Sequence, residues 1–200
     1  MNKPKIDFSD ISTVEEKLVE RHVIFQGKVL RLEKDDISLP DGRPAIREVI
    51  RHNGAVAVVP VDDKGRVICV RQFRYPYREI LLEIPAGKLE KGENDHEAAA
   101  RRELREETGA IPGKMTYLGR FYSSAAILDE IIHVYLAEDL SFGDTDPDDD
   151  EYLDVTAIPM EELCDMIAAG EVPDGKTQAS VMKAAYILNK RKETKETKIK

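Results

Sequence analysis

The sequence predicts an α/β (α+β) fold, in which a mixed sheet has helices on both faces and is preceded by a small antiparallel β appendage. Three patterns indicate this fold. Apolar and polar residues alternate over 17–52, as in short paired strands, and the apolar run at 54–61 is typical of a strand buried on both faces. Later segments with helical periodicity supply the helices. With 200 residues, of which 42% are hydrophobic, the chain can bury one good-sized core.

Residues 1–16 are polar, and we expect them to form a flexible N-terminus. The segment 17–52 is predicted to be an N-terminal antiparallel β domain of three strands, with turns after Gly27 and at 39–43. A sheet of this size is too small to be stable alone. It must therefore pack on the rest of the chain, on a second copy of itself, or on both.

Residues 53–190 are predicted to form the main domain, and the Lys/Glu/Thr-rich residues 191–200 a disordered tail. After the buried strand come a hairpin turn at 62–65 and its returning strand. A loop and a helix follow, with helices again toward the C-terminal end. The remaining expected elements are strands at 115–122, 131–137 and 152–158, and helices at 160–169 and 176–191.

Composition excludes several classes of protein. A formal net charge of −9 argues against a nucleic-acid binder, which needs a basic surface. No apolar run reaches about 18 residues, so no membrane span is expected, and the N-terminus lacks the apolar core of a signal peptide. Cys69 and Cys164 lie far apart in the sequence, which suggests free thiols and a cytoplasmic location.

The stretch 87–109 carries the chemistry. It begins as a glycine-punctuated loop and becomes helical from about Asp95, with Gly109 as the C-terminal stop and Asn94 followed by Glu97 as a capping box. At about 100° per residue, three carboxylates share one face of this helix and repel one another unless a cation lies between them. These acids are Glu103, Glu106 and Glu107.

Two interpretations of that face are open. Hard divalent cations such as Mg²⁺ prefer oxygen ligands, which favours a metal site. The alternative is a solvated helix face, on which Glu97–Arg101 and Arg102–Glu106 are ordinary pairs four residues apart.

Together with the preceding Glu-Ile-Pro-Ala-Gly at 83–87, this stretch resembles the Nudix box, a loop-helix-loop signature. The matching residues are Gly87, Glu93, Arg102, Glu103, Leu104, Glu106, Glu107 and Gly109. Eight residues separate Glu93 from Arg102 where the family pattern has seven, so we expect the extra residue to bulge the loop near 94–96. The resemblance implies a Nudix-type α/β/α sandwich, with 53–190 as its catalytic domain.

Motifs outside the box, among them Arg71-Gln-Phe-Arg74 and Gly54-Ala-Val56, resemble bacterial ADP-ribose pyrophosphatases over about residues 20–165. This resemblance implies Mg²⁺-dependent hydrolysis of ADP-ribose to AMP and ribose 5-phosphate, with Mn²⁺ as an alternative ion, by a homodimer that exchanges its N-terminal sheets. It implies substrate binding by Arg47 and Glu48 (adenine), Phe25 (stacking), Arg74 (diphosphate) and Glu83. It implies metal binding by the Ala86 carbonyl, Glu103, Glu106, Glu107 and Glu151, and catalytic roles for Arg102, Glu106, Asp149 and Glu151.

Two departures bear on the substrate. Asp149 stands where the family usually has a glutamate, and Ala125-Ala126 stand where ADP-ribose enzymes commonly have Pro-Gly. The acidic segment 138–154, which contains Asp149, is interpreted either as a solvated loop or as a loop that closes over the metal. The alternatives are hydrolysis of another nucleoside diphosphate derivative (a sugar nucleotide or a dinucleotide) and a non-catalytic ADP-ribose sensor. For Arg47 and Glu48 the alternative is an exposed cross-strand pair.

Overall fold

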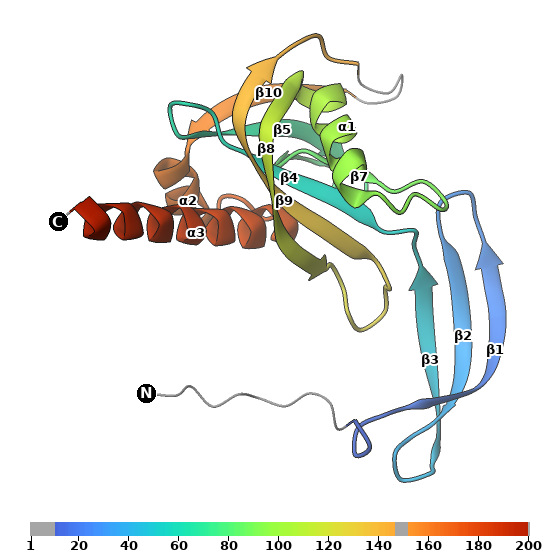
Figure 1. Ribbon diagram of the computed structural model, residues 1–200. Coiled ribbons are helices and arrows are strands. Elements are labelled where there is room, and N and C mark those ends of the chain that lie inside the picture. Colours follow the sequence, from blue (N-terminus) through green and yellow to red (C-terminus); the bar gives the residue numbers. More distant parts are fainter. Residues whose placement is uncertain (1–10, 147–151, 200) are drawn as a thin grey trace. The chain divides into compact units, whose positions relative to one another are not determined.

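The computed structural model describes residues 11–146 and 152–199, with 195–199 described by their backbone alone (Figure 1). The chain divides into two compact units. The N-terminal unit consists of Met1–His52 and Ser124–Glu130, and the catalytic unit consists of Asn53–Ser123 and Ile131–Lys200.

The N-terminal unit is built on an antiparallel sheet of three strands in the order β1-β2-β3. These are β1 (Lys17–Gln26), β2 (Arg31–Ser38) and β3 (Pro44–Arg51). They confirm the small antiparallel β appendage of the predicted fold class. The segment 124–130 joins this unit through backbone hydrogen bonds, from Ile50 N to Ile127 O (2.7 Å) and from Asp129 N to Ile50 O (3.1 Å).

The central strand of this sheet carries buried acids. Glu33 is 2% exposed and Asp35 6% exposed. Arg21 donates to Asp35 from Nε and Nη2, both at 2.9 Å, and Arg51 Nε donates to Glu33 Oε2 at 2.7 Å. The pKa of Asp35 is lowered, because the hydrogen bond from Arg21 outweighs the burial that would raise it. Paired charges therefore occupy most of the buried face of this strand, beside the buried Ile37.

The catalytic unit holds two sheets. The mixed sheet has the order β7-β4-β9-β8, in which β4 runs parallel to β9 and antiparallel to β7. Its strands are β4 (Ala55–Pro60), β7 (Ala86–Lys88), β8 (Ala110–Tyr122) and β9 (Ile131–Phe142). The second sheet has the order β10-β5-β6, with strands β5 (Arg66–Arg74), β6 (Glu79–Glu83) and β10 (Leu153–Pro159).

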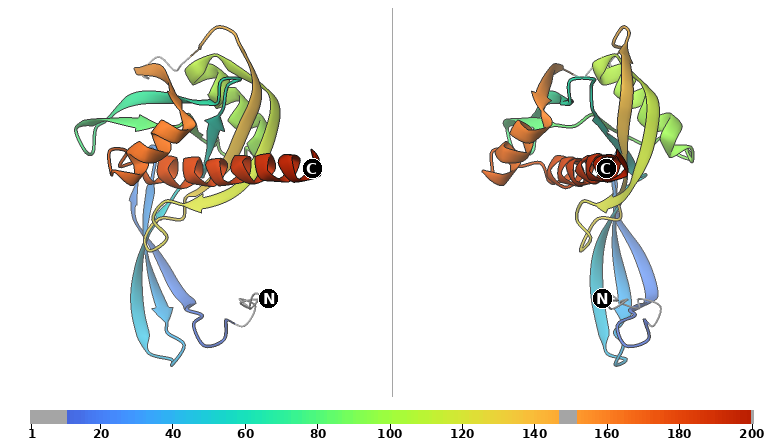
Figure 2. Two further views of the ribbon diagram at one scale, coloured as in Figure 1. Left: turned by 90° about the vertical axis from the view of Figure 1, so that its left-hand side faces the viewer. Right: turned by 60° about the vertical axis from the view of Figure 1, so that its left-hand side comes forward.

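Helices cover both faces of the mixed sheet, as Figures 1 and 2 show for this unit. Helix α1 (His96–Thr108) lies on one face, and α2 (Met160–Ala168) and α3 (Gly175–Ile199) lie on the other. The alternation along β4 explains why all six of its residues are buried. Val56 and Val58 pack against Ala99, Ala100 and Leu104 of α1.

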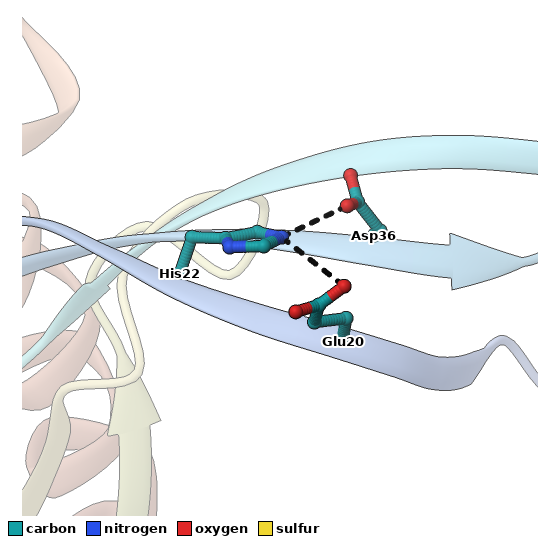
Figure 3. Close-up of side chains that lie close together, drawn as sticks. All are labelled: Glu20, His22 and Asp36. Atoms are coloured by element: carbon teal, nitrogen blue, oxygen red, sulfur yellow. Dashed lines mark hydrogen bonds and ion pairs between the residues drawn. The ribbon is translucent and has the colours of Figure 1, made fainter.

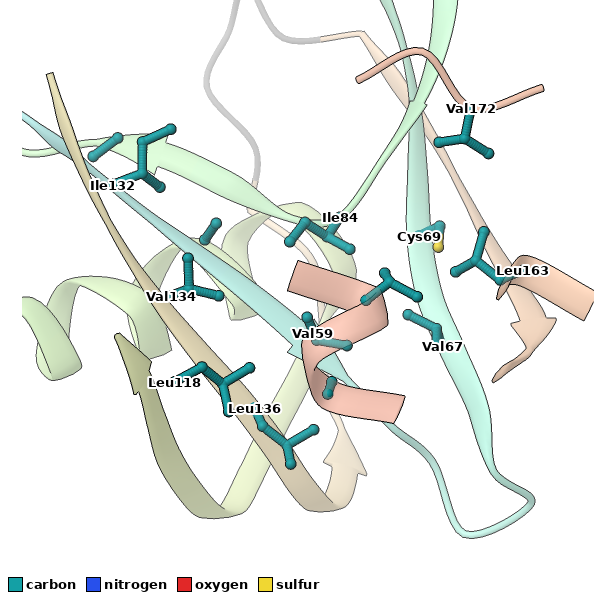
Figure 4. Packing of buried hydrophobic residues seen from close by; sticks show 14 residues of the cluster. Val59, Val67, Cys69, Ile84, Leu118, Ile132, Val134, Leu136, Leu163 and Val172 are labelled. Carbon is teal, nitrogen blue, oxygen red and sulfur yellow. The ribbon is translucent and has the colours of Figure 1, made fainter. Parts of the chain in front are cut away.

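The opposite side of β4 contributes to the larger core. Ala57 and Val59 pack there with Val67 and Cys69 of β5 and with side chains of α2 and α3 (Figure 4). The predicted α/β/α arrangement with a mixed sheet is confirmed. Among the described residues, no helix combines the length and the apolar character needed to cross a membrane.

Two details differ from the sequence prediction. The N-cap of α1 is Asp95, whose Oδ1 accepts from Ala98 N at 3.0 Å, whereas Asn94 donates its side-chain amide to Gly92 O. The predicted capping box at Asn94 is therefore wrong by one residue. Both side chains can cap a helix, and the backbone around Gly92 decides between them.

The disordered tail expected at 191–200 is instead helical up to Ile199. Lys and Glu are good helix formers, and the segment contains neither glycine nor proline. Lys190 Nζ pairs with Glu193 Oε2 at 2.7 Å, and Thr194 Oγ1 donates to Lys190 O at 2.8 Å. Residues 1–10 of the expected flexible N-terminus lie outside the described residues.

Replacing Gly109 by alanine should destabilise the protein. Gly109 ends α1 at φ +70°, and a Cβ there would lie 2.4 Å from Gly143 O. We expect a loss of more than about 1–2 kcal/mol in the free energy of unfolding, the cost of a left-handed alanine alone. Urea unfolding measures it. Gly65→Ala is the matched control, because Gly65 has φ +74° but open space around it. Equal losses in the two variants would contradict the predicted clash.

Candidate active site

The loop from β6 to β7 is fixed by hydrogen bonds from three other elements. Thr177 Oγ1 accepts from Ile84 N at 2.9 Å, and Pro85 O accepts from Val58 N at 2.9 Å. Ala86 N donates to Glu107 Oε2 at 3.3 Å. The backbone at Ala86 and Gly87 is thereby held against α1.

The carboxylates of Glu103 and Glu107 on α1 lie close to this loop. A Cβ built on Gly87 would lie 1.9 Å from Glu103 Cδ, so the Glu103 carboxylate occupies the space that a larger residue would need. Glu107, one turn further along α1, is only 4% exposed. The side chain of Glu103 is 13% exposed. A solvated helix face does not describe these two acids.

Arg102 lies among three acids of the Nudix-like stretch. Its Nη1 is 2.9 Å from Glu103 Oε1 and 2.9 Å from Glu106 Oε2, and its Nη2 is 3.6 Å from Glu93 Oε2. Burial alone would lower the pKa of Arg102, but the charges of Glu103 and Glu106 outweigh it and raise the pKa. The extra residue after Glu93 does not separate Glu93 from Arg102. Arg102 therefore offsets part of the repulsion among these carboxylates.

A second charged pair lies on β5 and β6. Arg74 donates from Nε and Nη2 to both carboxylate oxygens of Glu83, each at 2.6 Å. Glu83 is 2% exposed, and burial would raise its pKa. The hydrogen bond from Arg74 and the charge of Lys176 outweigh burial and lower the pKa. The hydrogen bond to Glu83 raises the pKa of Arg74, as do the charges of Asp174 and Glu107. Of the acids on α1, Glu107 therefore acts on the charge of Arg74.

Sequence reasoning missed three residues: Lys176, which bonds this pair, Thr177, which bonds the loop, and Asp174, which bonds both of them. Lys176 Nζ bonds the Glu83 carboxylate, and Asp174 Oδ2 accepts from Thr177 N at 2.9 Å. The run Asp-Gly-Lys-Thr at 174–177 is a recognisable helix start, because aspartate is a favoured N-cap. That signal predicts a cap, but it does not reveal the contacts with β6.

The remaining candidate residues belong to the N-terminal unit or fall outside the described residues. Phe25, Arg47 and Glu48 belong to the N-terminal unit. Arg47 Nε donates to Glu16 Oε2 at 2.9 Å, and the exposed Glu48 lies opposite Lys34 in the sheet register. Asp149 and Glu151 lie outside the described residues.

A cluster of Glu20, His22 and Asp36 lies in the N-terminal sheet (Figure 3). His22 Nε2 is 3.0 Å from Asp36 Oδ2 and 3.8 Å from Glu20 Oε2. Within the described ranges it is the one group of three metal-ligand residues whose ligand atoms all lie within 4.8 Å of one another. Lys34 also pairs with Asp36, at 3.5 Å, and Glu20 is largely exposed, so this group is an ion-pair cluster of the sheet surface.

The donor chemistry at the β7–α1 contact suits a hard divalent ion. Glu103 at Gly87 and Glu107 at Ala86 offer carboxylate oxygens, and the absent Cβ of Gly87 leaves room for the close approach of Glu103. A family model described as the NUDIX domain matches residues 51–179. The chain belongs to the Nudix family. Nudix hydrolases generally use a divalent metal ion, and the resemblance drawn from the Nudix box is confirmed.

A second model, the nucleoside diphosphate sugar hydrolase N-terminal domain, matches residues 16–50. The chain is 43% identical to the ADP-ribose pyrophosphatase of Bacillus subtilis (strain 168), over 86% of this chain and 93% of that protein. It is 41% identical to the methanol dehydrogenase activator of Bacillus methanolicus, over 84% of this chain and 91% of that protein.

Another relative carries a different name. A GDP-mannose pyrophosphatase of Yersinia pestis (strain Pestoides F) is 34% identical, over 66% of this chain and 71% of that protein. Among solved structures, that of an ADP compounds hydrolase has a TM-score of 0.79 at 20% identity and covers 88% of this chain and 96% of its own. This likeness supports the Nudix fold.

Replacing Gly87 by alanine should displace Glu103 and impair the site without unfolding the protein. The new Cβ needs the space of the Glu103 carboxylate, and a long side chain can move away more easily than the backbone. A misplacement of about 1 Å can cost roughly 100-fold in rate, and we expect a loss of that order in kcat/KM. In Gly143→Ala, the control, the Cβ would lie 3.5 Å from its nearest neighbour. Unchanged kinetics in Gly87→Ala would contradict the role of this contact.

Proposed function

We propose that this Nudix hydrolase cleaves the diphosphate bridge of ADP-ribose to AMP and ribose 5-phosphate in a Mg²⁺-dependent reaction. The contact of Glu103 and Glu107 with the Ala86–Gly87 backbone carries this proposal, since it brings two carboxylates to the same short stretch of backbone. The name of the relative at 43% identity, an ADP-ribose pyrophosphatase, supports the choice of substrate.

In this proposal Glu103, Glu106, Glu107, Glu151 and the Ala86 carbonyl would hold the metal, with Mn²⁺ as an alternative ion. The bound ion supplies charge neutralisation for the phosphates and lowers the pKa of an attacking water. Arg102 keeps Glu103 and Glu106 together on α1.

Arg74 would contact the diphosphate of the substrate, since a guanidinium matches phosphate oxygens. Glu83 fixes its orientation through the bidentate pair, while the Arg74 side chain stays 37% exposed to receive a ligand. Asp149 or Glu151 would hold the attacking water and accept its proton. An aspartate at 149 is one methylene shorter than the family's glutamate, which favours Glu151 as the base.

We also propose a homodimer that exchanges its N-terminal sheets, so that Arg47, Glu48 and Phe25 contact the adenine of the partner's substrate. Exposed apolar side chains on β1 support it, because a monomer would leave them in water. They are Leu18, Val19, Val23, Ile24 and Phe25, each more than half exposed. The cytoplasm is the proposed location, and two free thiols are consistent with a reducing compartment.

A second candidate function is hydrolysis of a sugar nucleotide or a dinucleotide. The match of residues 16–50 to a nucleoside diphosphate sugar hydrolase domain favours it, as do Ala125 and Ala126 in place of the Pro-Gly of ADP-ribose enzymes. A non-catalytic ADP-ribose sensor is a third candidate. A substrate panel with products identified by mass separates the three, because a sensor binds ADP-ribose without forming AMP.

The decisive variant is Glu107→Gln, measured in a Mg²⁺-dependent assay with ADP-ribose. The amide keeps the shape of Glu107 but removes the charge that would hold the metal, so we expect turnover to fall by at least about 100-fold with the fold intact. Glu97→Gln is the control on the same helix, since Glu97 pairs with Arg101 and has no proposed role in metal binding. Near-normal turnover of Glu107→Gln at saturating Mg²⁺ would rule out this assignment.

The dimer is tested by size-exclusion chromatography with light scattering. The wild type should have twice the mass of one chain. Charged replacements of two exposed valines, Val19→Glu with Val23→Glu, should yield monomers, because a charge is costly to bury in an apolar interface. Ile111→Glu, an exposed apolar position on β8, is the control and should leave the mass unchanged. A monomeric wild type would refute the exchange of sheets.

A further inference from the structure

The first turn of α3 and the residue before it, Asp174, have no role in the reaction proposed above. Two polar side chains of this turn are nevertheless largely buried. Thr177 is 0% exposed, and the side chain of Lys176 is 11% exposed. Buried polar groups persist in native proteins when their hydrogen bonds are satisfied. The partners of these two side chains lie on the strand and loop that present the site.

Thr177 fixes the loop. Its Oγ1 donates to Asp174 Oδ2 at 2.6 Å and accepts from Ile84 N at 2.9 Å, across 93 residues of sequence. The ladder between β5 and β6 ends at Glu83, so Ile84 N–H has left the sheet and needs another acceptor. Ile84 precedes Pro85 and Ala86. The hydrogen bond from Ile84 to Thr177 therefore helps to position the backbone that faces Glu103 and Glu107.

Lys176 fixes the arginine. Its Nζ bonds Glu83 and also Asp174, the latter at 3.0 Å. Glu83 in turn holds Arg74 through two hydrogen bonds. Two cations therefore share one buried carboxylate, and Lys176 bonds Oε2 of Glu83, the oxygen that also accepts from Arg74 Nη2.

We propose that Asp174, Lys176 and Thr177 form a positioning turn that orients two separate parts of the site. Thr177, oriented by Asp174, sets the Ala86–Gly87 backbone at the metal ligands. Lys176, through Glu83, sets Arg74 toward the substrate diphosphate. The identities of the two ligands rest on the proposed function, whereas the two tethers follow from the hydrogen bonds. All three are positioning residues, because they act through others.

The loop tether is tested with Thr177→Val, which keeps the shape of threonine and removes its hydroxyl. We expect the Mg²⁺ concentration for half-maximal activity to rise roughly tenfold, since the loop loses one of three anchors. Mn²⁺ binding without substrate, followed by electron paramagnetic resonance, should weaken in parallel at the site that Glu107→Gln abolishes. Thr177→Ser should restore both values. Ser180→Ala is the control, because Ser180 is buried one turn later on the same helix and its Oγ has no partner within the described residues.

The arginine tether is tested with Lys176→Met, which leaves the Asp174–Thr177 cap in place. We expect KM for ADP-ribose to rise roughly tenfold, with Mn²⁺ binding unchanged, because the variant releases Glu83 and Arg74 but not the loop. Lys190→Met is the control, an exposed lysine of the same helix. The two variants should therefore affect different ligands.

The outcomes separate this inference from the proposed function. Variants that lower only the melting temperature, with Mn²⁺ binding and kinetics unchanged, would show a purely structural turn and overturn the inference. Equal effects of Thr177→Val and Lys176→Met on metal binding and on substrate binding would contradict the proposal that the two residues position separate parts of the site. A wild type that does not cleave ADP-ribose would refute the substrate, and weaker Mn²⁺ binding by Thr177→Val would still establish the loop tether.

Discussion

Backbone and carboxylate share a very small space where Gly87 of β7 meets Glu103 of α1. A single added carbon atom would overlap the carboxyl group, so the two elements approach as closely as their atoms allow. The buried face of α1 sets how deep the helix lies, because Ala99, Ala100 and Leu104 pack directly on Val56 and Val58. The hydrophobic core thus determines how near the acids come to the loop.

The negative charge of the acids at this contact is balanced in part by arginines. Arg102 bonds Glu103 and Glu106 directly, whereas Arg74 pairs with Glu83 of β6. Removing one partner of a buried pair is far more costly than the net worth of the pair. The Glu83 carboxylate, with Arg74 and Lys176 as partners, is therefore a rigid anchor beside the site. Rigidity of this kind suits a guanidinium that must meet a phosphate in one orientation.

Much of this arrangement was predictable from the sequence, for identifiable reasons. The apolar run of β4 predicted its burial on both faces, and Gly109 predicted the end of α1. The spacing of Glu103 and Glu107 predicted that they share one face of the helix. The helical state of 191–199 was missed because charged, polar composition is shared by solvated helices and disordered tails. The bond from Ile84 to Thr177 joins positions 93 residues apart. No local pattern encodes such a contact, since only the folded sheet brings the two segments together.

The segment 124–130 lies between β8 and β9 in the sequence but hydrogen-bonds to β3 of the N-terminal unit. Its Asp129 accepts from His52 N, 77 residues earlier in the chain. Contacts of such sequence separation form late, because closing a long loop costs entropy before any contact is gained. During synthesis on the ribosome, the appendage must therefore wait for residues 53–123 to emerge before this hydrogen-bonded edge can form. Deleting the first 52 residues would likewise leave this segment behind without its partner strand.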